Sequence, residues 1–290
     1  MQQTYTVKEL VPYLNWIYFF HAWGFPARYA HISQIHNCIS CRRQWISIFP
    51  SEEQTRAEEA IHLFDTATEM LSQHSSDLTI RCLFELFPCY SKVDDIILRR
   101  KDGALFTLPM LRQQTPNHEG YCLSVADFIS EDPSQHEQIG VFCTSVSSAS
   151  EDEEKPSLLF QTLCDRLAEA GAERLHEEVR KNFWGYAADE QLTPAEMFQA
   201  KYQGIRPAVG YPCLPDISIN FLLDELIGFQ KVGIRLTEHG MMIPHASVSG
   251  LMLSHPQAHY FSIGQVSEDQ IEDYAQRRNL PVDMIRKYIC

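Results

Sequence analysis

The segment Arg206-Pro-Ala-Val-Gly-Tyr211 carries the side chains best suited to hold a small charged ligand. Its arginine offers a planar fork of N–H donors to a carboxylate, and its tyrosine offers a hydroxyl group and an aromatic face. Pro207 fixes the backbone, while Gly210 allows the chain to approach a flat ring closely. Taken alone, these six residues also fit a surface turn that happens to contain an arginine.

A second group of reactive side chains is Cys38-x-x-Cys41, with His36 close by. Zinc prefers four ligands, and three candidates in one short loop leave one missing. A redox-active pair would need a helix N-terminus to lower the thiol pKa, and the flanking residues show no such start. We therefore interpret this group as structural and predict no metal site. The nine cysteines are odd in number and scattered along the chain, which indicates free thiols in a reducing cytoplasm.

Histidine and serine crowd residues 239–259, where the chain carries His239, His245, Ser247, Ser249, His255 and His259. A serine nucleophile would want a Gly-x-Ser-x-Gly turn, of which only the trailing part is present. We therefore expect polar loops and strand edges here, and we predict no catalytic residue.

Neither a Gly-x-Gly-x-x-Gly nor a Walker A loop occurs, so a nucleotide-like ligand that binds here would be one that needs no phosphate cradle. S-adenosylmethionine is such a ligand, because its charged end is an amino acid that wants a cation and a hydrogen-bond acceptor.

The overall charge narrows the class of partner. The formal net charge is −14, from 24 Lys and Arg against 38 Asp and Glu. Non-specific binding to nucleic acid or to an anionic membrane needs a basic surface, so we predict neither. The first residues lack the basic-then-apolar pattern of an export signal, and no apolar run approaches the roughly 20 residues that span a bilayer. These observations predict a cytoplasmic protein.

Several segments predict the elements that would position these side chains. Residues 52–73 and 157–182 place apolar side chains at helical spacing. Thr193-Pro-Ala-Glu196 and Ser267-Glu-Asp-Gln270 have the pattern of a capping box, so each predicts a helix start. Strands are predicted at residues 78–87, 95–100, 104–108, 121–128, 138–145, 234–238, 248–254 and 260–266, with turns at 100–103 and 255–258.

Strands and helices do not alternate regularly in this order, which favours an α+β fold with antiparallel pairing over a doubly wound sheet. Residues 145–156 are polar and acidic and end at a proline, and they predict an exposed loop. Since the motifs on both sides of this loop are needed together, we predict one domain over residues 1–290.

Many short strings of this sequence, taken in order, form a recognisable pattern. They are Asp165-Arg-Leu-Ala-Glu-Ala170, Leu175-His-Glu-Glu-Val-Arg-Lys181, Phe183-Trp-Gly-Tyr186, Tyr202-Gln-Gly-Ile-Arg-Pro-Ala208, Gly210-Tyr-Pro212, Ala246-Ser-Val-Ser-Gly250, Ser254-His-Pro256, Tyr13-Leu-Asn-Trp16 and Leu111-Arg-Gln-Gln-Thr115. Through these strings the chain resembles the activation domain of cobalamin-dependent methionine synthase. The resemblance runs over most of the chain and is densest at residues 163–280.

The resemblance implies a single curved α+β domain with a twisted antiparallel sheet flanked by helices and S-adenosylmethionine in a shallow groove. Arg206 would hold the ligand's carboxylate, the backbone around Ala208 would meet the adenine, and Tyr211 would stand beside the groove. Tyr260 and Phe261 would line the other side, and Glu169 would lie near the ligand. Family members restore methylcobalamin after its cobalt has been oxidised, with an electron from a flavodoxin-type donor and the methyl group of S-adenosylmethionine.

Three positions depart from the family pattern: Asn15 stands where an aspartate is expected, Ala200 replaces a glutamate and Ile217 replaces a histidine. An amide still accepts a hydrogen bond from an ammonium but lacks the charge that strengthens it. The sequence also lacks the Asp-x-His-x-x-Gly loop that ligates cobalt, so cobalamin would have to be held by a separate methionine synthase on which this chain acts in trans. The alternative is a non-catalytic adaptor of the same fold that docks on the synthase and binds S-adenosylmethionine weakly or not at all.

Overall fold

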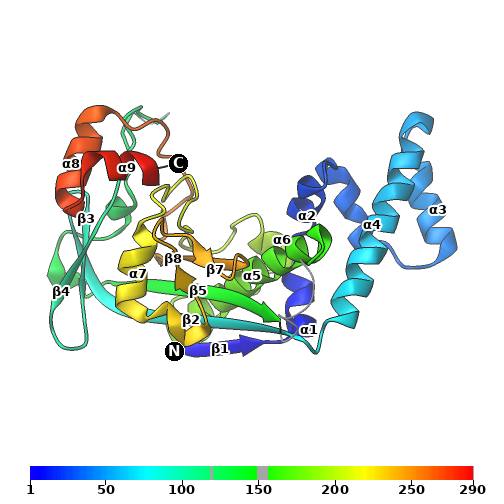
Figure 1. Ribbon diagram of the computed structural model, residues 1–290, viewed down its shortest axis with the longest axis horizontal. Coiled ribbons are helices and arrows are strands. Elements are labelled where there is room, and N and C mark those ends of the chain that lie inside the picture. Colours follow the sequence, from blue (N-terminus) through cyan, green and yellow to red (C-terminus); the bar gives the residue numbers. More distant parts are fainter. Residues whose placement is uncertain (118–119, 149–155, 290) are drawn as a thin grey trace.

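The structure is a computed structural model that describes residues 1–117, 120–148 and 156–289. Figure 1 shows an arc-shaped molecule, with α8 and α9 at one end and α3 and α4 at the other. The strands are β1 (Gln2–Tyr5), β2 (Leu78–Lys92), β3 (Asp95–Arg99), β4 (Leu105–Pro109), β5 (Gln138–Ser148), β6 (Arg235–Leu236), β7 (Met242–Ile243) and β8 (Ser247–Met252). The α-helices are α1 (Val7–Leu10), α2 (Trp16–Ala22), α3 (Ile39–Ser47), α4 (Gln54–Gln73), α5 (Leu158–Glu178), α6 (Pro194–Met197), α7 (Ile219–Ile227), α8 (Glu268–Arg278) and α9 (Val282–Tyr288).

The main sheet is antiparallel throughout and has the order β4-β3-β2-β5-β8, with β1 paired to β2 beside this path. Strand β2 is long enough to serve two regions. Its residues 78–88 pair with β5, and its residues 89–92 pair with β3 in a hairpin. The predicted α+β class with antiparallel pairing is therefore confirmed. No helix among the described residues is long and apolar enough to cross a membrane.

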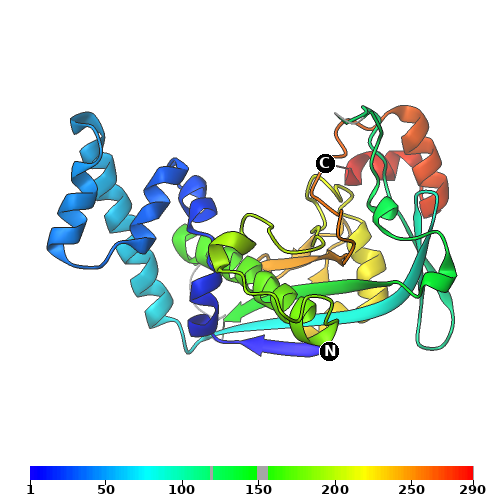
Figure 2. The same cartoon turned by 180° about the vertical axis from the view of Figure 1, so that it is seen from behind.

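The sheet is covered on both faces, as the alternation of its side chains requires. Ile80, Cys82 and Phe84 of β2 belong to the core beneath α5, whereas Leu83 and Phe87 belong to the core beneath α7. Helix α7 lies in front of the sheet in Figure 1 and α5 lies in front in Figure 2. Helix α5 approaches the sheet closely at Gly171, where an added Cβ would lie 2.9 Å from the side chain of Ile80.

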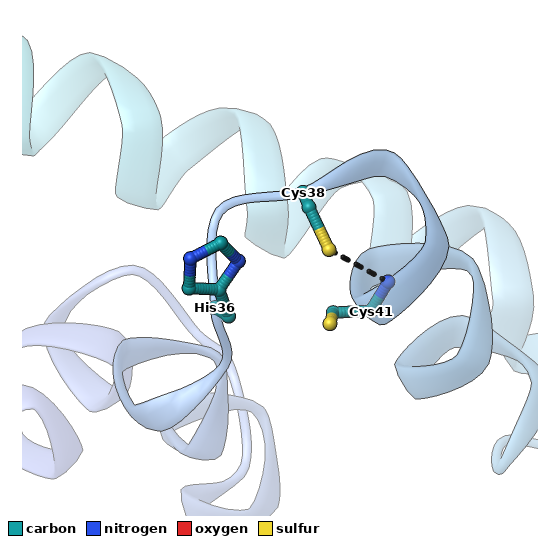
Figure 3. Close-up of side chains that lie close together, drawn as sticks. All are labelled: His36, Cys38 and Cys41. Atoms are coloured by element: carbon teal, nitrogen blue, oxygen red, sulfur yellow. Dashed lines mark hydrogen bonds between the residues drawn. The ribbon is translucent and has the colours of Figure 1, made fainter.

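The N-terminal part forms a helical arm at one end of the arc, held by aromatic packing. Trp45 and Phe49, both buried, pack against Tyr29, and the rings of Tyr29 and Phe49 stack with centroids 4.9 Å apart. Helix α3 of this arm starts at Cys38, whose sulfur accepts a hydrogen bond from the backbone N–H of Cys41 at 3.3 Å (Figure 3). The expectation that no helix begins at this cysteine pair is wrong.

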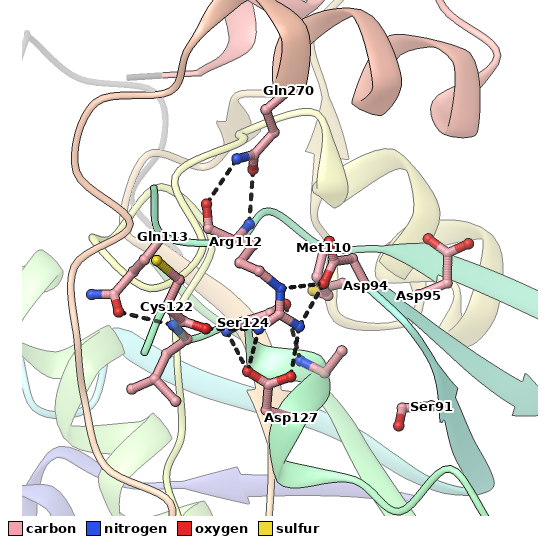
Figure 4. Close-up of polar contacts among 12 residues, drawn as sticks. Ser91, Asp94, Asp95, Met110, Arg112, Gln113, Cys122, Ser124, Asp127 and Gln270 are labelled. Atoms are coloured by element: carbon pink, nitrogen blue, oxygen red, sulfur yellow. Dashed lines mark hydrogen bonds and ion pairs between the residues drawn. The ribbon is translucent and has the colours of Figure 1, made fainter. Parts of the chain in front are cut away.

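The C-terminal end of the arc is tied to the sheet through Arg112 (Figure 4). Its guanidinium forms ion pairs with Asp94 and Asp127, in both cases at 2.6 Å. Its backbone N–H donates to the Gln270 side chain of α8 at 2.8 Å, and its carbonyl accepts from the same amide at 2.9 Å. Arg112 thereby connects three parts of the structure: the β2–β3 hairpin, the loop before β5, and helix α8. Residues around position 112 therefore have a structural role.

Most predicted elements are present, with shifted ends. The helix at 52–73 is α4 preceded by a short 3-10 turn, and the helix at 157–182 is α5 followed by a π-helical turn, Val179–Phe183. The turn at 100–103 closes with a hydrogen bond from Gly103 N–H to the Arg100 carbonyl at 2.9 Å. The capping box at Thr193 is formed, although its helix, α6, has only four residues.

Four further expectations are wrong. Residues 121–128 form a 3-10 turn (Val125–Phe128) with no strand, and residues 260–266 form no strand either. Helix α8 begins where expected, but Ser267 makes no side-chain cap to the helix backbone. Residues 145–148 of the expected acidic loop belong to β5, and its residues 149–155 lie outside the described residues.

Candidate functional site

A cleft of about 920 Å³ is lined in part by residues of α2, α5 and α6. In Figure 1 these helices lie in the middle of the arc, between its two ends. Its lining comes from four stretches that are far apart in the sequence: residues 13–22, 162–173, 197–213 and 260–262. Seven of the eight predicted ligand residues line it, namely Asn15, Glu169, Arg206, Ala208, Tyr211, Tyr260 and Phe261. The fold therefore gathers these side chains at one place.

The segment 206–211 is held in position by the free edge of β8. Ala208 pairs with Gly250 in a short antiparallel bridge, and Leu251 N–H donates to the Pro207 carbonyl at 3.0 Å. A Cβ added to Gly250 would lie 2.2 Å from that carbonyl oxygen, so only glycine permits this approach. The backbone of the segment is thus fixed to the sheet while its Arg206 and Tyr211 side chains reach the cleft.

Arg206 is the most deeply placed cation of the cleft, with 9% of its side chain exposed. It forms an ion pair with Glu173 of α5, also nearly buried, at 3.0 Å. Burial is the largest single influence and would lower the pKa of Arg206, but Glu173 together with Tyr260, Tyr202 and Glu169 outweighs it. The pKa is therefore raised, and the arginine stays charged. Its Nε atom is buried and makes no hydrogen bond to any residue that the structure describes. The same is true of Glu173 Oε1. One donor and one acceptor are therefore left over in this buried pair.

Tyr211 and Glu169 form a more open part of the same lining. The Tyr211 hydroxyl donates to Glu169 Oε1 at 2.7 Å, and half of the tyrosine remains exposed. Partial burial, together with the adjacent carboxylate, raises the pKa of Tyr211. The hydroxyl therefore stays protonated at neutral pH and offers an aromatic face beside a carboxylate.

Tyr260 and Phe261 are held in the cleft by specific contacts. The Tyr260 hydroxyl accepts from the backbone N–H of Arg206 at 3.0 Å and lies 3.1 Å from the hydroxyl of Tyr202. The backbone N–H of Phe261 donates to the sulfur of Cys213 at 3.1 Å. These contacts fix the 260–262 loop against the 206–211 segment without strand pairing.

Asn15 is the N-cap of α2, and its Oδ1 accepts from the backbone N–H of Ile17 at 3.1 Å. Ala200, which stands where the resemblance led us to expect glutamate, also lines the cleft. Ile217 does not line it and packs beneath Gly210 instead. Gly210 is likewise outside the lining; its φ of +85° serves the turn that carries Tyr211.

Sequence reasoning missed several cleft residues, above all Glu173 and Arg166. Glu173 lies four residues after Glu169 and therefore shares its helix face, a signal that was available in the sequence. Arg166, one helical turn before Glu169, also lines the cleft. It makes no ion pair with any residue in the described part of the chain. The cleft thus has a second cation near its rim.

The crowded histidines do not form a cluster. His245 contacts Asp165 at 3.2 Å beside the cleft. His255 and His259 instead lie near Phe128, with ring centroids 6.1 and 5.7 Å from that of the phenylalanine. No metal-ligating group of three or more residues involves them within residues 1–117, 120–148 and 156–289.

Comparison with known proteins agrees with this geometry. The family model described as "Vitamin B12 dependent methionine synthase, activation domain" matches residues 6–279. A solved structure described as the MetH reactivation domain bound to AdoHcy is similar to the whole chain, with a TM-score of 0.83 and 31% sequence identity. The match covers 99% of this chain and 88% of that one. The chain therefore belongs to the family of activation domains of vitamin B12-dependent methionine synthase.

Proposed function

We propose that this protein binds S-adenosylmethionine in the cleft and presents its methyl group to cobalamin held by a separate methionine synthase. The observation that carries the proposal is the convergence of Arg206, Glu169 and Tyr211 on one cleft from distant parts of the chain. The similar solved domain is described as bound to AdoHcy, the product that remains when S-adenosylmethionine loses its methyl group.

The residues present fit a ligand that ends in an amino acid. Arg206 keeps its charge, and its Nε donor has no partner in the part of the chain that the structure describes, which suits a carboxylate. The carboxylate of Glu169, one turn before Glu173 on α5 and part of the same lining, suits an ammonium. Ala208 belongs to the cleft lining, and the half-exposed ring of Tyr211 suits a flat ring of the ligand.

The chain needs no general base for the transfer. S-adenosylmethionine supplies an electrophilic methyl group, and its transfer to reduced cobalamin leaves S-adenosylhomocysteine. The task of the protein is placement and the exclusion of water. The arc suits this task, because the helices that contribute to the cleft lie between its two raised ends (Figure 2), and these ends would contact a cobalamin-binding domain. A flavodoxin-type protein would supply the electron.

Calorimetry tests the ligand. Wild type should bind S-adenosylmethionine and S-adenosylhomocysteine with one site per chain. Arg206→Ala would leave Glu173 buried without its partner, so the better variant replaces both, Arg206→Met with Glu173→Leu, and should lose binding while staying folded. Arg235→Ala, an exposed arginine outside the cleft, is the matched control and should bind normally.

A non-catalytic adaptor is the second candidate, and the side chain of Asn15 favours it. This residue has no charge, and its oxygen already caps α2. Adding the protein to a methionine synthase whose own activation domain has been removed separates the two. The methyl-donor function requires reactivation that depends on S-adenosylmethionine and on the Arg206–Glu173 pair, whereas an adaptor would bind the synthase with no binding of S-adenosylmethionine in calorimetry.

A further inference from the structure

Three potential metal ligands lie together in the helical arm, away from the cleft. His36, Cys38 and Cys41 each offer one ligand atom, and the three atoms lie within 4.8 Å of one another. Figure 3 shows the imidazole and the two thiols facing a common space where α3 begins. Cys38 and Cys41 are partly buried and His36 is exposed, so the space is open to ions from solvent.

The helix that carries the two thiols is firmly anchored. Trp45 and Phe49, at and just beyond the end of α3, are buried, and Phe49 stacks on Tyr29. Arg42, next to Cys41, forms an ion pair with Asp65 of α4. The thiols are therefore presented by a rigid first turn, and little conformational entropy would be lost when they bind an ion.

The chemistry of the three groups selects the kind of ion. Two thiolates and an imidazole are the ligands that zinc takes, at about 2.3 Å from sulfur and about 2.0–2.1 Å from nitrogen. Tetrahedral ligands at these lengths lie about 3.5–4 Å apart, so small side-chain rotations bring the present group to that geometry. Two thiolates also neutralise a divalent ion, while Arg42 already has Asp65 as its counter-ion.

We propose that His36, Cys38 and Cys41 form a zinc site with three protein ligands and a fourth position open to solvent. No fourth histidine, cysteine or carboxylate joins the group within the part of the chain that the structure describes. Three protein ligands with an open position are the arrangement of zinc sites that accept a further ligand. Binding would release the thiol protons to solvent.

Cobalt titration of the reduced, full-length protein tests the site, with Co²⁺ as a spectroscopic probe and Zn²⁺ as competitor. The expected result is one Co²⁺ per chain, a thiolate-to-cobalt charge-transfer band, and loss of that band when Zn²⁺ is added. Cys38→Ser and Cys41→Ser should each abolish the band, and His36→Ala should weaken binding by about tenfold or more. Cys122→Ser is the matched control, because Cys122 is also partly exposed but lies outside the group.

The absence of a charge-transfer band in fully reduced protein would overturn the proposal. So would a band of unchanged strength in both cysteine variants, or one that disappears in Cys122→Ser. Since all readouts concern the metal itself, the result is independent of whether the cleft binds S-adenosylmethionine.

Discussion

Replacing Glu173 by glutamine removes one charge from the buried pair with Arg206 and should have two opposite effects. The free protein should become less stable, because an uncompensated guanidinium remains in a site that is about one-tenth exposed. A ligand that carries a carboxylate should bind more tightly, because its charge replaces the one that was removed.

The magnitudes follow from the geometry of the pair. At an effective dielectric constant of about 20, two unit charges 3.0 Å apart attract by about 5.5 kcal/mol. The burial of the carboxylate offsets part of this, and breaking a buried pair from one side costs about 3–5 kcal/mol. Glutamine keeps an acceptor oxygen, so we expect a loss of about 3 kcal/mol in the free energy of unfolding. A charge-assisted hydrogen bond of about 1–3 kcal/mol to the freed guanidinium should tighten ligand binding by about tenfold.

Urea unfolding gives the first quantity and calorimetry with S-adenosylhomocysteine gives the second. Glu178→Gln is the control on the same helix: its carboxylate pairs with Arg174 at 2.9 Å and lies outside the cleft. This variant should lose some stability and leave the affinity unchanged. If Glu173→Gln weakens both stability and affinity, Glu173 itself contacts the ligand's ammonium, and the reasoning that it competes for Arg206 is refuted.

Three further predictions concern other parts of the molecule. Gly250→Ala should lower the free energy of unfolding by about 1–3 kcal/mol and abolish ligand binding in calorimetry, because the added Cβ would displace the Pro207 carbonyl. The control is Gly140→Ala, whose Cβ would meet the Met252 side chain; this variant should lose stability but keep ligand binding. Burial and two neighbouring arginines hold the pKa of His176 well below its usual value. As the pH falls, the imidazole is therefore protonated in the unfolded state before it is protonated in the folded state. The free energy of unfolding should fall by about 1.4 kcal/mol per pH unit below about pH 6.5. His176→Phe should remove this slope in urea titrations, and an unchanged slope would contradict it. The hydrogen bond with the Cys41 thiol lowers the pKa of Cys38 to about 6, so in metal-free protein its alkylation rate should reach half of its maximum near that pH, and a midpoint near pH 9 would refute the assignment.

The elements that sequence alone predicts well are those whose pattern is local. Helices α4 and α5 show their apolar spacing directly, and the hairpin turn at 100–103 is marked by its glycine. Helix α3 was not predicted, because cysteine is not a usual N-cap and the sequence of the helix is mainly polar. Its stability comes from the packing of Trp45 and Phe49, which only the tertiary structure reveals.

The failed strand at 260–266 shows a different limit. Its residues have the composition of a strand, but a strand also needs a partner edge. The free edge of β8 is taken by Ile205 and Ala208, which bridge to Leu253 and Gly250. Residues 260–266 are therefore left to isolated contacts, such as the hydrogen bond from Ile263 N–H to the Pro212 carbonyl at 2.9 Å. Competition for one edge cannot be read from either segment alone.

Asn15 also has two roles, a local one as the N-cap of α2 and a tertiary one in the lining of the cleft. Aspartate and asparagine are about equally good N-caps, so the cap on α2 is preserved and the position of the helix does not depend on the charge. What changes is the electrostatics of the cleft, and there α5 contributes Asp165, Glu169 and Glu173 to the same lining. Glu173 pairs with Arg206, so we infer that Asp165 and Glu169 supply the acceptors for an ammonium and that the neutral residue at position 15 shifts this task to α5.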